Sequence, residues 1–171
     1  THVGWGRADP ATHRRQGAIH EALFAVCTRP SYMAAHQSAV LGREVLQSLS
    51  GAGPRLEVFM GHDTNVTALA AALRVDLAAP GYATNDVPPG GALQLERLRD
   101  RRSGASFVRV SYRTQPPAAL RTAERTTSLI PLRVPGCGSI LCPADTFRSV
   151  LQSRLAALAP RQARTTSPAG N

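Results

Sequence analysis

The segment over residues 56–73 constrains the fold more than any other part of this chain. It opens with Leu56 to Met60, a mostly apolar run that is too short for a helix and therefore predicts a buried strand. Gly61 follows, and apolar residues then recur at helical spacing from Val66 to Leu73. A strand, a tight glycine turn and a helix in this order predict an α/β fold.

Two side chains in this segment can carry chemistry. His62 and Asp63 stand at the expected start of the helix, where the end of a strand meets helix amides that favour anions. An aspartate at a helix start is more often an N-cap than a catalyst, and a lone histidine is usually a satisfied polar side chain. The dipeptide alone leaves the structural and the catalytic interpretation open.

Helical and strand-like patterns alternate over the rest of the chain. Two helices, one opened by Asp9-Pro10 and one from Tyr32 to Ser50, are expected to form an antiparallel pair. The later patterns predict a hairpin formed by 93–97 and 107–112, a short helix after Pro117, a strand over 129–134 and a last helix over 144–158. The polar tail over 161–171, punctuated by Pro and Gly, is expected to be disordered.

Composition and charge exclude several classes of protein. With 43% hydrophobic residues in 171, the chain can bury one sizeable core, and no apolar run approaches the roughly 18 residues of a membrane span. The net charge of +9 comes entirely from arginine, but the arginines are scattered and aromatic residues are few. We therefore expect neither a membrane nor a nucleic acid as partner. A basic interaction domain stays open as an alternative, and steep salt dependence of polyanion binding would identify it.

Two of the three cysteines bracket a short loop. Cys137 and Cys142 are either a small disulfide or half of a metal site, and no second Cys or His pair follows at ligand spacing. A disulfide is therefore expected, which implies an oxidising compartment. Cys27 stands alone in a helical pattern and is expected to be a buried, small apolar side chain.

The string from Leu56 to Leu73, LEVFMGHDTNVTALAAAL, closely resembles the C-terminal His-Asp signature of the histidine acid phosphatases, in particular the bacterial periplasmic phytases and glucose-1-phosphatases. Other segments agree in the same order: Gly4-Trp5-Gly6-Arg7, the Val87-Pro88-Pro89-Gly90-Gly91 turn before a strand with Glu96-Arg97, and Val134-Pro135-Gly136-Cys137 through Cys142 before a helix with Phe147, Val150 and Leu151. The resemblance covers nearly all of residues 4–158, and it is to the C-terminal half of the family.

The resemblance implies an α/β fold with a mainly parallel sheet flanked by helices, incomplete and with part of a helical lobe. Residues 1–53 would form the helical pair and belong partly to that cap lobe. Residues 54–160 would form the C-terminal part of the phosphatase core, followed by the tail. The fragment would have exposed sheet edges, so we expect homo-oligomers, aggregation or association with the missing half.

The resemblance also implies an activity and a set of site residues. The family hydrolyses phosphomonoesters at acidic pH through a phosphohistidine, without a metal or cofactor, and its type here would be periplasmic or secreted. His62 would be a second active-site histidine that binds phosphate, Asp63 the proton donor to the leaving alcohol, and Thr64 a residue lining the substrate. We expect His62 and Asp63 to face a pocket for the phosphate group, with phytate or sugar phosphates as candidate substrates.

One departure from the family pattern qualifies this prediction. The family nucleophile lies in an Arg-His-Gly-x-Arg-x-Pro motif, and no Arg-His-Gly occurs in this chain. The chain is therefore expected to be the C-terminal half of a longer enzyme, to need the missing N-terminal half as its partner, and to be inactive alone. The alternative is a non-catalytic phosphatase-like module that binds phosphorylated ligands.

Overall fold

The computed structural model describes residues 7–156, so the tail expected over 161–171 lies outside the described residues. Along the chain the elements are α1 (Pro10–Cys27), α2 (Ser31–Ser48), α3 (Asp63–Ala72), β1 (Ala92–Arg99), β2 (Ser106–Thr114), α4 (Pro117–Thr122), β3 (Ser128–Leu132), β4 (Leu141–Pro143) and α5 (Ala144–Ala156). Asp9 begins α1 as expected, because its side chain accepts a hydrogen bond from the backbone N–H of Thr12 at 2.6 Å.

The sheet is antiparallel throughout the described residues. Its order is β1-β2-β3, and β4 also pairs with β2. The expectation of a mainly parallel sheet is therefore wrong for this part of the chain. The physical reason lies in the connections: β1 and β2 form a hairpin, and short loops can join only antiparallel neighbours, whereas parallel neighbours need a long crossover.

The segment over 56–60 is not the buried strand that its apolar sequence predicted. Its backbone belongs to no strand, and Leu56, Val58 and Met60 keep 79%, 71% and 91% of their surface exposed. A strand needs a neighbour to accept and donate its backbone hydrogen bonds. No segment of residues 7–156 pairs with this one, so its apolar side chains stay in solvent.

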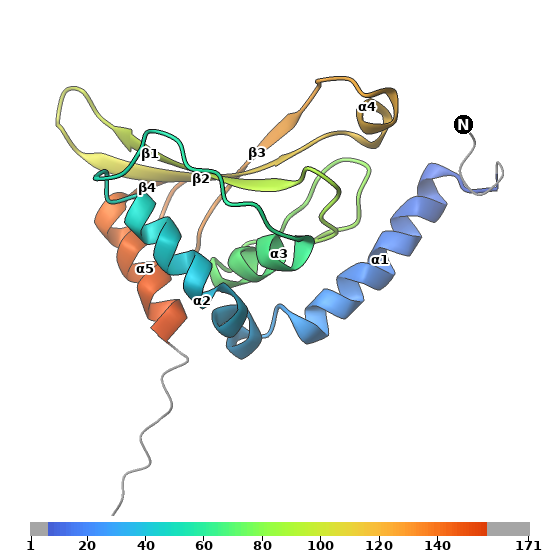
Figure 1. Ribbon diagram of the computed structural model, residues 1–171, viewed down its shortest axis with the longest axis horizontal. Helices are drawn as coiled ribbons and strands as arrows, with labels where there is room; N and C mark the ends of the chain where they lie inside the picture. Colours follow the sequence, from blue (N-terminus) through green and yellow to red (C-terminus); the bar gives the residue numbers. More distant parts are fainter. Residues whose placement is uncertain (1–6, 157–171) are drawn as a thin grey trace, which may run out of the picture.

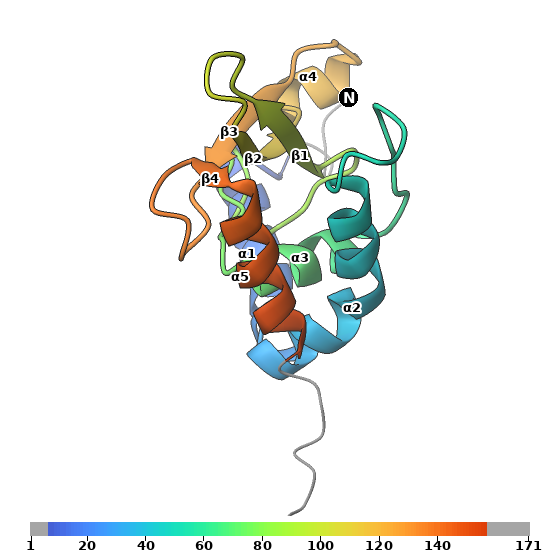
Figure 2. The same ribbon diagram turned by 90° about the vertical axis from the view of Figure 1, so that its left-hand side faces the viewer.

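Helices α2, α3 and α5 lie together on one side of the sheet (Figures 1 and 2). Together with β2 they enclose a single core. The largest fully buried side chains of this core include Leu73, Tyr112, Phe147 and Leu151. Burial raises the pKa of the Tyr112 hydroxyl to about 12. Most of α3 is buried, because small and apolar residues from Thr67 to Ala72 let it sit between α2 and the sheet. This packing holds the first residues of α3 in place.

Helix α1 does not form the expected antiparallel pair with α2 but extends away from α2 and α5 (Figure 1). Among its residues only Gly17 and Phe24 are buried. At its C-terminal end, Arg29 donates hydrogen bonds to Asn85 at 3.0 Å and Asp76 at 2.6 Å, which fix the corner between α1 and α2. Cys27 is exposed rather than buried, since the last turn of α1 has no neighbour covering that face among the described residues.

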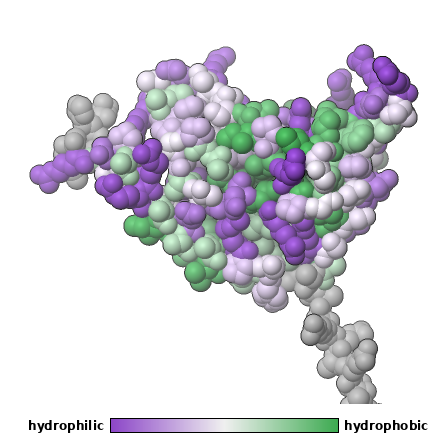
Figure 3. Space-filling view, turned by 180° about the vertical axis from the view of Figure 1, so that it is seen from behind, coloured by the Kyte–Doolittle hydropathy of each residue, from purple (hydrophilic) through white to green (hydrophobic). Residues whose placement is uncertain are grey.

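Large apolar side chains also remain exposed elsewhere. The side of the molecule opposite to that of Figure 1 has apolar surface gathered near its middle, between polar projections at either side (Figure 3). Besides segment 56–60, the exposed large apolar residues include Ile19, Leu23 and Val26 of α1, Tyr32 and Val40 of α2, Leu129 of β3, and Ile140 and Leu141. None of the helices between residues 7 and 156 is both long and apolar enough to cross a membrane.

The Cys137–Cys142 disulfide is present, as expected, with a Cα–Cα distance of 4.8 Å. It closes the loop that leads from β3 to β4. Cys142 lies in β4 and is buried against the core, and α5 begins directly after Pro143. The disulfide therefore anchors the start of α5 to the edge of the sheet.

Candidate active site

The start of α3 carries the residues singled out by the sequence. His62 is the N-cap, and its backbone N–H donates to Asn65 Oδ1 at 2.9 Å, while the Asn65 N–H donates back to the His62 carbonyl at 3.0 Å. Asp63 is the first residue inside the helix, so it is not the N-cap that the structural interpretation assumed. Its Oδ1 accepts from the Thr64 N–H at 2.7 Å.

A further side chain, His20 of α1, lies against Asp63. The His20 Nε2 is 3.5 Å from Asp63 Oδ2, and its Nδ1 is 3.1 Å from Asp86 Oδ1. The imidazole thus bridges two carboxylates, one at the start of α3 and one in the loop before β1. Its ring also packs on Phe24, with the ring centroids 4.3 Å apart.

Gly17 allows α1 to come this close to the loop. A Cβ added at Gly17 would clash with Asp86 Oδ2 and would lie 3.2 Å from the Cβ of Ala83. Any larger side chain would therefore push the Asp86 carboxylate away from His20. Gly17, His20 and Phe24 follow one another at spacings of three and four residues, so they share one face of α1.

The sequence patterns assigned no role to His20 and did not predict this contact. The signal that could have found it is the shared face itself, where a glycine and an aromatic residue at helical spacing flank a histidine. The identity of the carboxylates it meets, however, depends on how α1 packs on segments far away in the sequence.

The candidate site is open to solvent. His62 and Thr64 are exposed, and the side chains of His20 and Asp63 keep 36% and 38% of their surface exposed. The cavities of about 410 and 390 Å³ lie elsewhere, the first at the far end of α3 and the second between α2 and α5. Neither includes His62 or Asp63, so a phosphate pocket facing these two residues stays a prediction.

Metal ligation finds no support in the described residues. Nowhere in residues 7–156 do three or more His, Cys, Asp or Glu side chains gather as ligands of one metal ion would. What His20, His62, Asp63 and Asp86 can offer is proton exchange and, from a protonated imidazole, attraction for an anion.

Comparison with known proteins relates the chain to phosphatases, although no family model matches it. It is 29% identical to the glucose-1-phosphatase of Salmonella typhimurium over an alignment of 108 residues that covers 58% of this chain and 26% of that protein. It is 28% identical to the phytase AppA of Escherichia coli over an alignment of 120 residues that covers 63% of this chain and 28% of the relative.

Solved phytases have the same fold. The phytase from Citrobacter braakii matches 90% of this chain and 44% of its own with a TM-score of 0.79 and 22% identity. The phytase from Klebsiella sp. ASR1 matches 89% of this chain and 42% of its own with a TM-score of 0.75 and 25% identity. The chain is histidine acid phosphatase-like.

The phosphatase-like chain corresponds to only part of these proteins. It spans little more than a quarter of the curated relatives and less than half of the solved phytases. The family resemblance seen in the sequence is thereby confirmed over this part. The roles of His62, Asp63 and Thr64 are not tested by these comparisons and belong to the proposal that follows.

Proposed function

We propose that this chain supplies the proton donor and a phosphate-binding side chain of an acid phosphatase that hydrolyses phosphomonoesters. The observation that carries the proposal is the Gly-His-Asp-Thr-Asn segment at the N-terminus of α3, within a fold shared with phytases. The nucleophilic histidine comes from sequence outside this chain, because these 171 residues contain no Arg-His-Gly.

In the proposed reaction, Asp63 exchanges one proton twice. The nucleophilic imidazole attacks phosphorus, the bond from phosphorus to the alcohol oxygen breaks, and the Asp63 carboxyl donates its proton to that oxygen. Water then attacks the phosphohistidine, and the Asp63 carboxylate accepts the proton that water loses. Inorganic phosphate leaves, and both the imidazole and the carboxyl return to their starting states.

His62, Thr64 and His20 have distinct parts in this scheme. His62 at the helix N-terminus binds an oxygen of the transferred phosphoryl group, where the amides of the first turn of α3 add favourable potential. Thr64, exposed beside it, lines the substrate. His20 is a positioning residue, since its contacts with Asp63 and Asp86 limit where the Asp63 carboxylate can lie.

The substrate class is a phosphomonoester, with phytate and sugar phosphates as candidates. Support comes from the relatives, which are named as a glucose-1-phosphatase and as phytases. A periplasmic or secreted location is part of the proposal, and the Cys137–Cys142 disulfide supports it because disulfides persist in oxidising compartments.

A second candidate function is a non-catalytic module that binds phosphorylated ligands. The absence of Arg-His-Gly from the chain favours it, because a phosphatase-like domain without a nucleophile can still hold an anion. The two candidates differ in whether the chain completes a catalytic site when the nucleophile motif is supplied.

The test joins this chain to the N-terminal part of the Citrobacter braakii phytase, in trans or as a fusion, and assays p-nitrophenyl phosphate and phytate. We expect no turnover by the chain alone, and turnover with an acid-trapped phosphohistidine when the N-terminal part is present. Asp63→Asn in the joined protein should lower kcat for phytate about 100-fold or more, because general acid catalysis is lost.

The matched control is Asp145→Asn, which removes an exposed carboxylate in the first turn of α5 that pairs with Arg148 at 3.0 Å. It should leave kcat unchanged. Phosphate binding without turnover in the joined protein would favour the non-catalytic module. Turnover by the chain alone that survives Asp63→Asn would refute the assigned roles.

A further inference from the structure

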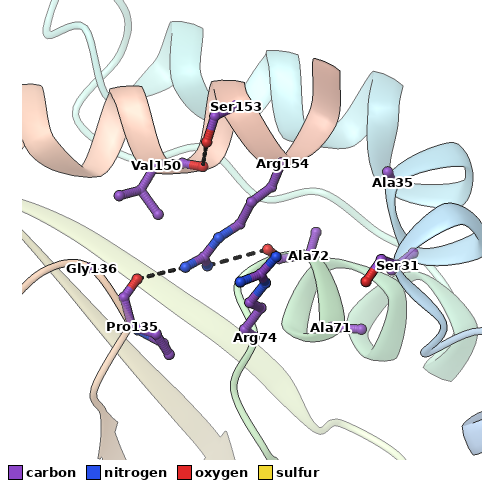
Figure 4. Close-up of a pocket in the computed structure, with 11 residues that line it drawn as sticks. Ser31, Ala35, Ala71, Ala72, Arg74, Pro135, Gly136, Val150, Ser153 and Arg154 are labelled. Carbon is purple, nitrogen blue, oxygen red and sulfur yellow. Dashed lines mark hydrogen bonds between the residues drawn. The ribbon is translucent and has the colours of Figure 1, made fainter. Parts of the chain in front are cut away.

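A cavity of about 410 Å³ lies at the end of α3 opposite to the candidate active site. It is enclosed by the start of α2, the end of α3, the Pro135-Gly136 turn and α5 (Figure 4). Its volume falls in the range of small-molecule sites. Its lining combines four alanines with two arginines, Arg74 and Arg154, and contains no carboxylate.

The two arginines reach the cavity from different elements. Figure 4 shows the guanidinium groups of Arg74 and Arg154 close together, the first coming from the end of α3 and the second from α5. Neither forms an ion pair with a carboxylate among residues 7–156. Burial, and then the charge of Arg74, lower the pKa of Arg154. Two cations side by side without a counter-charge repel each other, and a bound anion would relieve that repulsion.

Arg154 is held rigidly in place. It donates to the Ala72 and Leu73 carbonyls at the end of α3, at 3.3 and 2.6 Å, and to the Pro135 carbonyl at 2.5 Å. A guanidinium carries five N–H donors, so these three bonds leave two free for a ligand. Arg154 therefore caps the end of α3 and still has N–H groups that can bind a ligand.

Arg74 occupies a position that glycine would suit better. Its φ is +54°. The Arg74 N–H donates to the Ala71 carbonyl, and the Val75 N–H donates to the Ala70 carbonyl. Helices that end with this hydrogen-bond pattern usually have glycine at the left-handed position. A non-glycine residue is disfavoured in this left-handed backbone conformation. The Arg74 side chain forms no ion pair within residues 7–156, so no carboxylate contact in this part of the chain offsets that cost.

We infer that this cavity binds a phosphate group, held between the guanidiniums of Arg74 and Arg154. Two guanidinium charges match a phosphate dianion, and arginine forks suit its oxygens. The start of α2 faces the same space, and no side chain caps its first amides, which adds potential that favours an anion. The alanine walls contact the organic part of a phosphate ester, so such an ester binds more tightly than inorganic phosphate.

This site is separate from the candidate active site. The ten residues of α3 place its two ends about 15 Å apart. The inference therefore does not depend on the proposed function, because it concerns binding by residues that take no part in the proposed reaction.

The test titrates the chain with inorganic phosphate and, separately, with phenyl phosphate, and follows backbone amide NMR signals. We expect saturable shifts at Ser31, Ala34, Ala35 and Ala72, with tighter binding of phenyl phosphate. Arg74→Gly should weaken phosphate binding about tenfold or more, because a charge-assisted contact is lost. The same variant should raise the thermal stability, because glycine adopts the positive φ at this position without strain. Arg74→Gln should weaken binding without that gain in stability.

The control variant is Arg102→Gln, which removes one positive charge from the exposed turn between β1 and β2. It should leave binding unchanged, whereas equal weakening by Arg102→Gln and Arg74→Gly would mean that only net charge matters. His62→Ala should also leave these shifts unchanged. Shifts confined to the start of α3, or shifts that do not saturate, would overturn the inference and leave the proposed phosphatase function standing.

Discussion

A single imidazole ties α1 to two carboxylates that lie far from it in the sequence. His20 contacts Asp63 and Asp86, and the missing side chain at Gly17 makes room for the approach. Helix α1 has few other buried residues, so this contact and the packing of Phe24 carry much of its attachment. The residue that positions Asp63 is thus also one that holds a helix.

Replacing His20 should loosen α1 selectively. We expect His20→Ala to lower the free energy of unfolding by about 1 kcal/mol, since it removes two half-exposed polar contacts and part of the Phe24 packing. Urea unfolding measures the loss, and hydrogen exchange should locate it in α1. His36→Ala, on the exposed face of α2 where the ring stacks only on Tyr32, is the control and should change little. An equal loss in both variants would contradict a bridging role for His20.

The site residues show which contacts a sequence can predict. His62, Asp63 and Thr64 were placed at a helix start from their neighbours alone, because a glycine turn followed by helical spacing is local information. The contacts of His20 were not predicted, because they depend on tertiary packing between α1, α3 and the loop that carries Asp86.

Among the elements, the β1–β2 hairpin carries a cross-strand ion pair. Glu96 and Arg109 lie directly opposite each other, with Arg109 Nε 2.8 Å from Glu96 Oε2 and a second bond of 3.2 Å to Oε1. The hydrogen bonds from Arg109 lower the pKa of Glu96, partly opposed by desolvation. A carboxylate whose pKa is lower in the folded state than in the unfolded state stabilises the fold at pH values above its unfolded-state pKa.

The hairpin should therefore lose this support in acid. Glu96→Gln should destabilise the chain by about 0.5 kcal/mol at pH 7, because the pair is partly exposed. The difference in the free energy of unfolding between the variant and the unmodified chain should shrink as the pH falls below 4.5, the ordinary pKa of glutamate. It should disappear once the pH has passed below the lowered pKa of Glu96, where the carboxyl is protonated in the folded chain as well. Urea unfolding at pH 7 and pH 3 measures it. Glu44→Gln, an exposed residue of α2, is the control, and a difference that stays constant with pH would refute the assignment.

Helices and the hairpin were predicted correctly, because their sequence patterns are local. Strands that must pair with segments distant in the sequence were not. The α2 and α3 helices and the β1–β2 hairpin follow the apolar periodicity closely. Segment 56–60 has the composition of a buried strand, but whether it becomes one depends on a neighbouring strand that residues 7–156 do not contain. The parallel character of the sheet failed for the same reason, since it too depends on which strands are adjacent.

For the molecule as a whole, segment 56–60 is the most conspicuous exposed apolar feature. Leu56, Val58 and Met60 keep 79%, 71% and 91% of their surface exposed, so the segment leaves an apolar side of the molecule open to solvent. In the proposed enzyme this side would lie against the half that carries the nucleophile. In the isolated chain, it should promote self-association.

Placing charges on this segment should keep the chain monomeric. We expect the double variant Val58→Glu and Met60→Glu to reduce self-association in sedimentation velocity without changing the circular dichroism spectrum, because both side chains are exposed. In the joined protein, it should weaken binding of the N-terminal part. Val40→Glu, an exposed apolar residue on α2, is the control. If the control and the double variant reduce self-association equally, the segment has no special part in it.

The exposed thiol at the end of α1 affects how all of these measurements are best made. Two of the three cysteines form the bridge that anchors α5, which leaves Cys27 as the single sulfhydryl able to react with a second molecule. In air, two copies can therefore become covalently linked through Cys27, and this would imitate apolar association. Cys27→Ser removes this link without any reducing agent, so it is the better background. Conversely, the native thiol accepts one maleimide fluorophore per chain, which makes α1 a natural place from which to follow docking of the N-terminal part by energy transfer.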